Sequence, residues 1–244
     1  MVQGIAAATW RVEDDGTLVV APPEGSERGV VVMGEGFDED GGTFGIPPWA
    51  ERDEDILAVR IEEGVCAQGS IADIFSGLSN LKTADVANLD TSAVTDMSWA
   101  FYGCCDMEEI DVSGWDVSGV TNLSSMFECC ESLRSVNMEG WDTSKVADMS
   151  WVFSYCFALE GLDLSGWDTG NVTTLEGLFQ SCESLRSVDA SGWDTAKVTS
   201  TAFLFMGCAS LEEVVGMDGW DLSAVEDDEC MFEGCREAFA QARA

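Results

Sequence analysis

The sequence predicts an α/β fold, a solenoid of strand–turn–short-helix units that follows a β-rich N-terminal cap. The first observation is a repeat: Trp115, Trp141, Trp167 and Trp193 lie 26 residues apart, Trp220 follows after 27, and an Asp follows each of them. The second observation is that a Phe and a Cys recur at fixed distances after that Asp. One copy cannot bury its apolar side chains alone, so the copies must stack.

Stacking turns each recurring position into a column of side chains. The Phe column, eleven residues after the Asp, contains Phe101, Phe127, Phe153, Phe179, Phe205 and Phe232. The Cys column, fourteen residues after it, contains Cys104, Cys130, Cys156, Cys182, Cys208 and Cys235. Apolar residues that recur without exception indicate a shared interior, so we expect both columns in the core.

The repeat also sets the domain boundaries. Residues 1–63 do not repeat and form the predicted cap, whereas residues 64–239 form the predicted solenoid. Residues 64–89 are a degenerate copy, residues 90–220 hold five full copies, and a truncated copy completes the solenoid. Residues 240–244 remain as a C-terminal tail.

Each copy is expected to contain one strand and one short helix. Leu162 and Leu164 alternate with Asp163, which is the period of a strand with one buried face. A helical stripe, with spacings of three and four, is predicted from Val146, Met149, Val152, Phe153 and Cys156. The expected N-caps of these helices are Thr95, Thr121 and Thr173.

The two ends of the chain contain further predicted elements. Residues 10–20 are typical of a β-hairpin with an Asp-Gly turn, and residues 30–32 and 56–61 of strands. The Gly-, Asp- and Pro-rich residues 34–48 predict a loop. Residues 237–243 predict an amphipathic helix that closes the far end of the solenoid.

Composition excludes several classes of function. The chain has 46 acidic and 11 basic residues, no histidine and a net charge of −35. Such a charge argues against binding to nucleic acid or to anionic membranes, which require Lys and Arg. Without histidine, Ser-His-Asp and Cys-His catalysis are excluded. No apolar run is long enough for a transmembrane helix, and the N-terminus does not have the pattern of an intact signal peptide.

The aligned copies resemble the BspA-like leucine-rich-repeat surface proteins, and more narrowly the subfamily first described in mycoplasma lipoproteins. The resemblance is carried by the Trp-Asp-Thr-Ser-Lys-Val motif at residues 141–146, by Met149, Phe153 and Cys156, and by residues 159–165. It covers residues 64–239. It implies a bacterial protein at the cell surface or secreted, which binds molecules of a host or a neighbouring cell.

The Trp and Asp columns each allow two interpretations. We expect the indoles to be buried in the turns, with an exposed aromatic strip as the alternative. The Asp after each Trp is expected to close an Asx-turn, with a column of calcium ligands as the alternative. No calcium-loop motif accompanies the column. The sequence therefore predicts neither a metal nor a cofactor.

The Cys column is expected to hold buried, reduced thiols, because no Cys-x-x-Cys motif is present. Four further cysteines lie outside it: Cys66, Cys105, Cys129 and Cys230. Cys105 and Cys129 fall near the same corner of adjacent copies, so a disulfide between them is a hypothesis.

Outward-facing positions of the predicted strands are the candidate binding surface, because leucine-rich arrays curve with this sheet on the concave side and solenoids bind there. The candidate partner-binding residues are Glu108, Glu109, Asp111, Arg134, Asn137, Glu160, Asp163, Arg186, Asp189 and Glu212. A solvated face without a ligand is the alternative interpretation.

The sequence as a whole predicts a non-catalytic, adhesin-like binding module. Its partner on the concave sheet would be a protein or a glycan, and a protein or glycoprotein partner would have a basic surface. A structural spacer or coat segment is the main alternative, and a carboxylate-based glycosidase is a weaker one. Periodic columns of acids do not provide the two singular carboxyl groups that a glycosidase needs.

Overall fold

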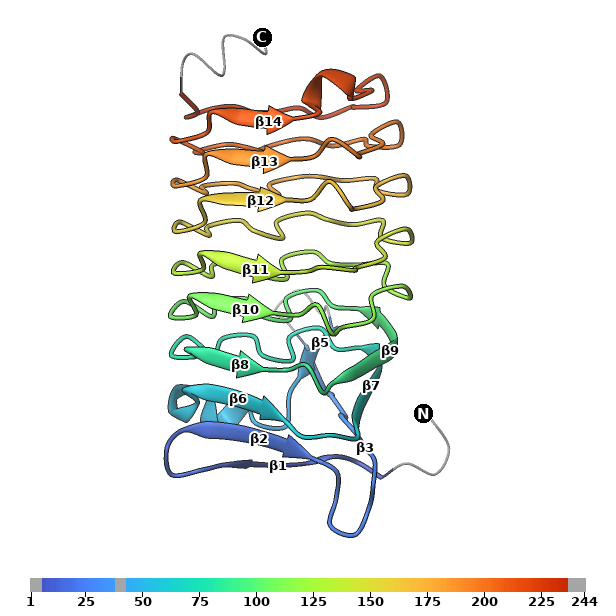
Figure 1. Cartoon of the computed structure of the whole chain (residues 1–244), viewed down its shortest axis with the longest axis vertical. Helices are drawn as coiled ribbons and strands as arrows, with labels where there is room; N and C mark the ends of the chain where they lie inside the picture. The colour runs from blue at the N-terminus through green and yellow to red at the C-terminus, as the bar shows by residue number, and fades with distance from the viewer. Residues whose placement is uncertain (1–5, 38–42, 237–244) are drawn as a thin grey trace.

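The computed structural model describes residues 6–37 and 43–236. Successive coils of the chain lie on top of one another along the long axis, and their short strands line up on one side (Figure 1). This side, the strand face, carries β8 (Thr83–Asp85), β10 (Glu109–Asp111), β11 (Ser135–Asn137), β12 (Gly161–Asp163), β13 (Ser187–Asp189) and β14 (Glu213–Val215). The predicted solenoid is confirmed.

The cap extends the strand face toward the N-terminus. β1 (Thr9–Val12) and β2 (Thr17–Ala21) form the predicted hairpin, and β2 pairs in parallel with β6 (Ala58–Ile61), which pairs with β8. A second sheet contains β3 (Gly29–Val30), β7 (Val65–Ser70) and β9 (Asp90–Asp96). A 3-10 helix, η1, spans Ala50–Asp55. The domain boundary at residue 63 stays a prediction.

The prediction of a loop over residues 34–48 is wrong for residues 34–37 and 43–46. β4 (Gly34–Phe37) and β5 (Thr43–Ile46) pair in an antiparallel hairpin in this segment. Glycine and proline are typical of turns. Strand pairing, however, uses backbone N–H and C=O groups, and every residue except proline has both. The predicted helix at residues 237–243 lies outside the described residues.

The predicted short helices, and with them the α/β label, are not confirmed. Residues 123–130 form successive turns in which N–H groups alternate between two uses. The N–H groups of Met126 and Cys130 donate to the carbonyl three residues earlier, whereas those of Phe127 and Cys129 donate to the next coil. An α-helix needs all of these donors within its own segment. Ser125 adopts a left-handed φ of 56°, which also interrupts a helix.

The predicted N-cap threonines join coils instead of capping helices. The hydroxyl of Thr121 donates to the carbonyl of Thr95 at 3.2 Å, and that of Thr173 donates to the carbonyl of Ala147 at 3.0 Å. Thr95 bonds to Gly69 in the same way. In the described residues, helical structure is limited to η1 and η2 (Met217–Gly219), both of 3-10 type. The fold is therefore a β-solenoid.

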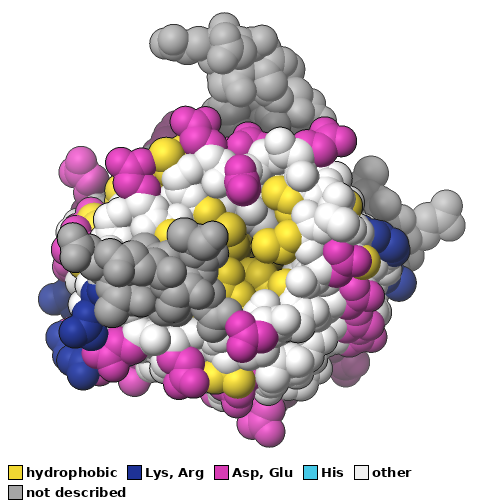
Figure 2. Space-filling view, turned by 90° about the horizontal axis from the view of Figure 1, so that it is seen from above, with side chains coloured by type: hydrophobic (Ala, Val, Ile, Leu, Met, Phe, Trp, Pro, Cys, Tyr) yellow, Lys and Arg dark blue, Asp and Glu magenta, His cyan; other side chains and the backbone are white. Residues whose placement is uncertain are grey.

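The Phe and Cys columns form the interior, as predicted. Neighbouring rings of the Phe column are stacked, for example Phe153 on Phe179 at 5.8 Å between centroids. Each Cys of the column donates its thiol to a Phe carbonyl of the preceding coil, as Cys156 does to Phe127 at 3.2 Å. Figure 2, which looks down the long axis, shows apolar side chains in the middle and acidic side chains around the rim.

Candidate binding cleft on the strand face

The structure places all ten predicted binding residues on or beside the strand face. Nine of them are exposed and Asp189 is half-buried. Glu108, Arg134, Glu160, Arg186 and Glu212 occupy equivalent positions just before successive strands, and the others lie within the strands. The residues that the sequence grouped therefore share one surface, although partner binding there stays a prediction.

Four of these residues have a structural task. Asp111, Asn137, Asp163 and Asp189 end their strands, and each Oδ1 accepts the backbone N–H two residues later, at 3.0, 3.2, 3.1 and 3.0 Å. Hydrogen bonds from Ser113 hold the pKa of Asp111 below its ordinary value, and those from Ser165 do the same for Asp163. Replacing these residues with alanine would disturb the turns, so they are poor probes of binding.

The charged row before the strands is partly neutralised. Arg134 lies 3.7 Å from Glu108, and Arg236 pairs with Glu212. No described acid forms an ion pair with Arg186. Both described pairs are well exposed, so water screens them and they contribute little to stability. They leave acidic side chains such as Glu109 and Glu160 available on this face.

The parallel ladder of the strand face is interrupted. β10 pairs with β11, and β12, β13 and β14 pair with one another, but β11 does not pair with β12. A second interruption separates β8 from β10. Figure 1 shows β11 and β12 farther apart than β12 and β13.

At the junction of β11 and β12, hydrogen bonds that recur elsewhere are not made. The N–H of Leu164 donates to the carbonyl of Asp189 at 2.8 Å, yet the equivalent N–H of Met138 does not reach Asp163. The backbone N–H of Arg186 donates to the carbonyl of Glu160 at 2.8 Å, yet the backbone N–H of Glu160 makes no such bond to the carbonyl of Arg134, one coil earlier. The facing edges of β11 and β12 therefore keep unpaired backbone groups.

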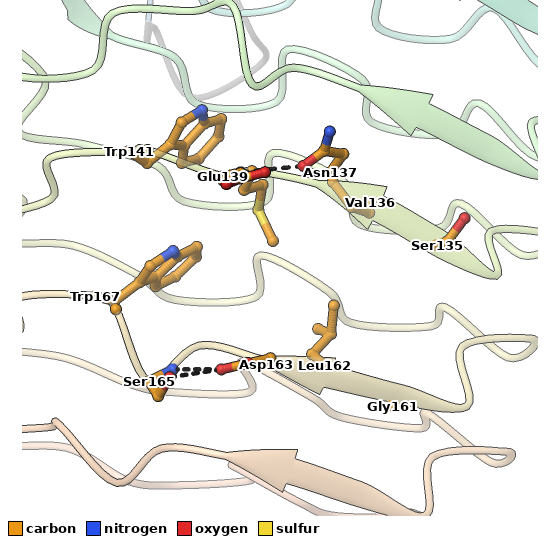
Figure 3. A pocket seen from close by; sticks show the side chains of 13 residues that line it. Ser135, Val136, Asn137, Glu139, Trp141, Gly161, Leu162, Asp163, Ser165 and Trp167 are labelled. Atoms are coloured by element: carbon orange, nitrogen blue, oxygen red, sulfur yellow. Dashed lines mark hydrogen bonds between the residues drawn. The ribbon is translucent and has the colours of Figure 1, made fainter.

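The opened junction forms a cleft with a volume of about 600 Å³, within the range of roughly 300–1,000 Å³ usual for ligand pockets. Figure 3 shows the facing side chains. Its apolar lining consists of Val136, Met138, Leu162 and the indoles of Trp141 and Trp167. Its polar lining includes Ser135, Asn137, Glu139, Asp163 and Ser165. An apolar floor with a few polar groups at its edge is suited to binding.

Inward-facing strand residues are more exposed at the open junction than at the paired ones. Val188 and Val214, in the paired strands, are 0% and 2% exposed. Val136 and Leu162 occupy the same position in β11 and β12, but both are only half-buried. The cleft thus exposes two side chains that the ladder covers in other coils.

The opening is confined to the strand face. Behind the cleft, the N–H of Phe153 still donates to the carbonyl of Leu178 at 2.9 Å. The isolated bridge of Asp148 with Thr174 also continues the series that runs from Asp96 to Asp227. The two coils therefore stay hydrogen-bonded through the turns behind the strand face and are separated only at the strands.

Sequence reasoning identified Asn137 and Asp163 in the cleft but missed the residues of its floor. A local signal is present at residues 137–139, which read Asn-Met-Glu where neighbouring copies read Asp-Val-Ser, Asp-Leu-Ser or Asp-Ala-Ser. Met138 has the longest side chain at its position among the neighbouring copies, and Glu139 replaces a serine. The signal shows which copy is unusual, whereas the unpaired strands are visible only in three dimensions.

The Trp column is buried, as expected, and its indoles bridge coils. Trp115, Trp141 and Trp193 donate their indole N–H groups to the carbonyls of Val86, Val112 and Leu164, at 3.1, 2.9 and 3.1 Å. Trp167, 5% exposed, makes no such bond to a described residue. The missing bond would cross the open junction to Met138.

The Asp column closes Asx-turns, also as expected. Asp116 and Asp142 accept the N–H two residues later at 2.9 and 3.1 Å. Hydrogen bonds from Ser118 and Ser144 lower the pKa of these two carboxyl groups. Within residues 6–37 and 43–236, no group of three or more potential ligands is arranged to hold a metal ion.

All ten cysteines are free thiols in the structure, so the hypothetical bridge between Cys105 and Cys129 is not formed. Burial raises the pKa of five thiols in the column, those of Cys130, Cys156, Cys182, Cys208 and Cys235. Burial and Glu128 raise the pKa of Cys129 to about 11. At neutral pH these cysteines therefore remain protonated and act as small apolar residues.

Comparison with known proteins assigns the chain to a family. The family model described as "Mycoplasma protein of unknown function, DUF285" matches residues 69–161 and 130–243. The chain belongs to this family. The match confirms the resemblance to the mycoplasma subfamily of BspA-like repeat proteins.

Two solved structures are distantly similar to the chain. A leucine-rich repeat protein from Eubacterium ventriosum is 13% identical with a TM-score of 0.34, and the alignment covers 94% of this chain and 93% of that one. A leucine rich cell surface protein from Faecalibacterium prausnitzii is 14% identical with a TM-score of 0.27, covering 88% and 94%. No curated protein matches the chain. Among the described residues, no helix has the length and apolar character needed to cross a membrane.

Proposed function

We propose that this protein is a non-catalytic surface protein of a bacterium that binds a protein partner through its strand face. The cleft between β11 and β12 carries the proposal. A spacer without a ligand gains nothing from unpaired strand edges and half-exposed apolar residues, which are liabilities in water. The family resemblance supports a location at the cell surface or outside the cell.

Charge indicates the kind of partner. The net charge is −35, and two acids stand exposed on the strand face: Glu109 in β10 and Glu160 just before β12. A partner with a basic surface is therefore attracted to this face, and its association becomes faster at low salt.

The carboxyl groups support a non-catalytic protein. General acid catalysis needs a carboxyl group with a raised pKa beside an ionised one. Burial raises the pKa of Glu128, but this residue lies in the turns behind the strand face. On the strand face, hydrogen bonds lower the pKa of Asp111 and Asp163.

A binding assay with matched charge reversals tests the proposal. The purified chain is measured by biolayer interferometry against a panel of purified host matrix proteins and neighbouring-cell surface proteins. We expect one or more basic members to bind, and the double variant Glu109→Arg, Glu160→Arg to weaken that binding about tenfold or more. The control, Glu226→Arg with Asp228→Arg, makes the same charge change on exposed residues beside the bridge formed by Asp227.

Equal weakening by both double variants would show that total charge, and not the strand face, attracts the partner. A panel in which nothing binds would favour the structural spacer instead.

A further inference from the structure

We infer that the cleft between β11 and β12 binds an extended peptide segment with alternating apolar and basic side chains. The inference rests on the proposed function and specifies its partner: a stretch of polypeptide that enters the strand face as an added strand.

The backbone of the cleft is the first argument. The N–H of Met138 and the N–H of Glu160 lack the partners that equivalent groups have at the paired junctions. The pairing partners of β11 and β12 lie on their outer sides only, at β10 and β13. Two facing strand edges with free donors and acceptors are a template for a peptide backbone, which adds hydrogen bonds without regard to its side chains.

Trp167 supplies a second, independent observation. Its side chain is 5% exposed and lines the cleft, and among described residues its indole N–H has no acceptor. In Figure 3 its nitrogen lies on the side of the ring that faces the coil of β11. This N–H is accessible from the cleft and is free to donate to a group that enters there. A carbonyl of an inserted peptide provides the acceptor that Val112 and Leu164 provide for Trp141 and Trp193.

The side-chain preference follows from the period of a strand. Alternate side chains of an extended peptide point to opposite faces. One set would contact the half-buried Val136 and Leu162, which favours apolar residues. The other set would point outward to Glu139 and Asp163 at the rim, which favours Lys or Arg.

A glycan fits the cleft less well. Sugar rings bind to aromatic side chains that offer an open ring face. The rings of Trp141 and Trp167 are instead stacked on each other at 6.2 Å and are only 6% and 5% exposed. Both rings offer the cleft an apolar edge and Trp167 also offers an N–H donor, which suits a peptide.

The test uses synthetic peptides and the full chain. The probe is a hexapeptide of alternating Val and Lys with blocked ends, titrated by calorimetry at physiological salt. Two derivatives keep its side chains but carry N-methyl groups on one or the other alternate set of backbone amides. We expect the parent to bind, and at least one methylated peptide to bind about tenfold more weakly because its ladder bonds are lost. A Val and Glu hexapeptide should not bind.

Matched variants locate the site. Glu139→Ser installs the residue that neighbouring copies have at this position, so the fold should persist. It should weaken binding about two- to fivefold, as expected for one exposed ion pair. The control Glu183→Ser removes the same charge from an exposed position outside the cleft and should change nothing. Leu162→Ser removes the apolar floor and should weaken binding further.

The outcomes separate this inference from the proposed function. Unchanged binding of both N-methylated peptides, or equal effects of Glu139→Ser and Glu183→Ser, would show attraction by charge alone and overturn the inference. Absence of peptide binding, in a chain that captures a panel protein through its strand face, would overturn the inference and leave the proposed function standing. Backbone-dependent binding lost with Leu162→Ser supports the inference even where no panel protein binds.

Discussion

Two neighbouring junctions of the solenoid carry similar repeats but differ on the strand face. β12 and β13 are paired along their length, whereas β11 and β12 are not paired at all. Behind both junctions the Phe column continues almost unchanged, with centroid distances of 5.8 Å for Phe153 to Phe179 and 5.5 Å for Phe179 to Phe205.

This difference shows that the core and the turns hold the coils together, and that the strand ladder is a separate contribution. A solenoid is stabilised mainly by contacts between nearest neighbours, so one junction can change without disturbing the next. The same property lets the junction of β11 and β12 open into a cleft while the junction of β12 and β13 stays paired. Four predictions test this separation.

The largest expected effect concerns the Phe column. Phe153 lies behind the open junction and Phe205 behind paired strands, and both are 0% exposed. If the opening stops short of the core, Phe153→Ala and Phe205→Ala should each lower the free energy of unfolding by about 3–5 kcal/mol. Urea denaturation followed by tryptophan fluorescence measures both. A much smaller loss for Phe153→Ala would mean that the opening reaches the core.

Two buried threonines differ between these two junctions. Across the closed one, Thr169 donates to the carbonyl of Asp194 at 3.0 Å and accepts its N–H at 2.8 Å. Across the open one, Thr143 only donates, to the carbonyl of Asp168 at 3.0 Å. Thr169→Val should therefore lower the free energy of unfolding by about 2 kcal/mol and Thr143→Val by about 1 kcal/mol. If urea denaturation showed the same loss of free energy of unfolding for both variants, the two threonines would not differ in their contribution to stability.

A pair of valines makes the comparison on the strand face itself. Val188 is 0% exposed in β13, and Val136 has the same position in β11 but is half-buried. Val188→Ala should cost about 1–2 kcal/mol, because two fully buried methyl groups are lost. Val136→Ala should cost less than about 1 kcal/mol. Thermal denaturation of both variants provides the check, and a larger loss for Val136→Ala would show that the cleft is closed in solution.

The sequence predicts the solenoid, its core columns and its Asx-turns because each depends on a residue type that recurs in register. Trp115 and Phe127 could be assigned to the interior from spacing alone. The helix failed because apolar spacings of three and four also arise in successive turns, where residues such as Ser125 adopt left-handed conformations. The cleft was missed because it is defined by hydrogen bonds that two ordinary strands do not make.

The smallest expected effect is a difference in acid sensitivity between the two edges of the cleft. Asp163 ends β12 and Asn137 ends β11, and both close the same turn, so an amide serves there as well as a carboxylate. Hydrogen bonds from Ser165 lower the pKa of Asp163 below the usual value of 3.8. A lowered pKa in the folded state stabilises the protein above the unfolded-state pKa, and this contribution is lost as the pH falls through the folded-state pKa.

Asp163→Asn should therefore fold normally at neutral pH. Its free energy of unfolding should be lower there than that of the original chain, and this difference should vanish in acid. The reverse change, Asn137→Asp, should add acid sensitivity at the other edge. Urea denaturation at several pH values between neutral and strongly acidic measures both, and parallel pH profiles for all three chains would show that the Asp163 carboxylate is not held by the turn.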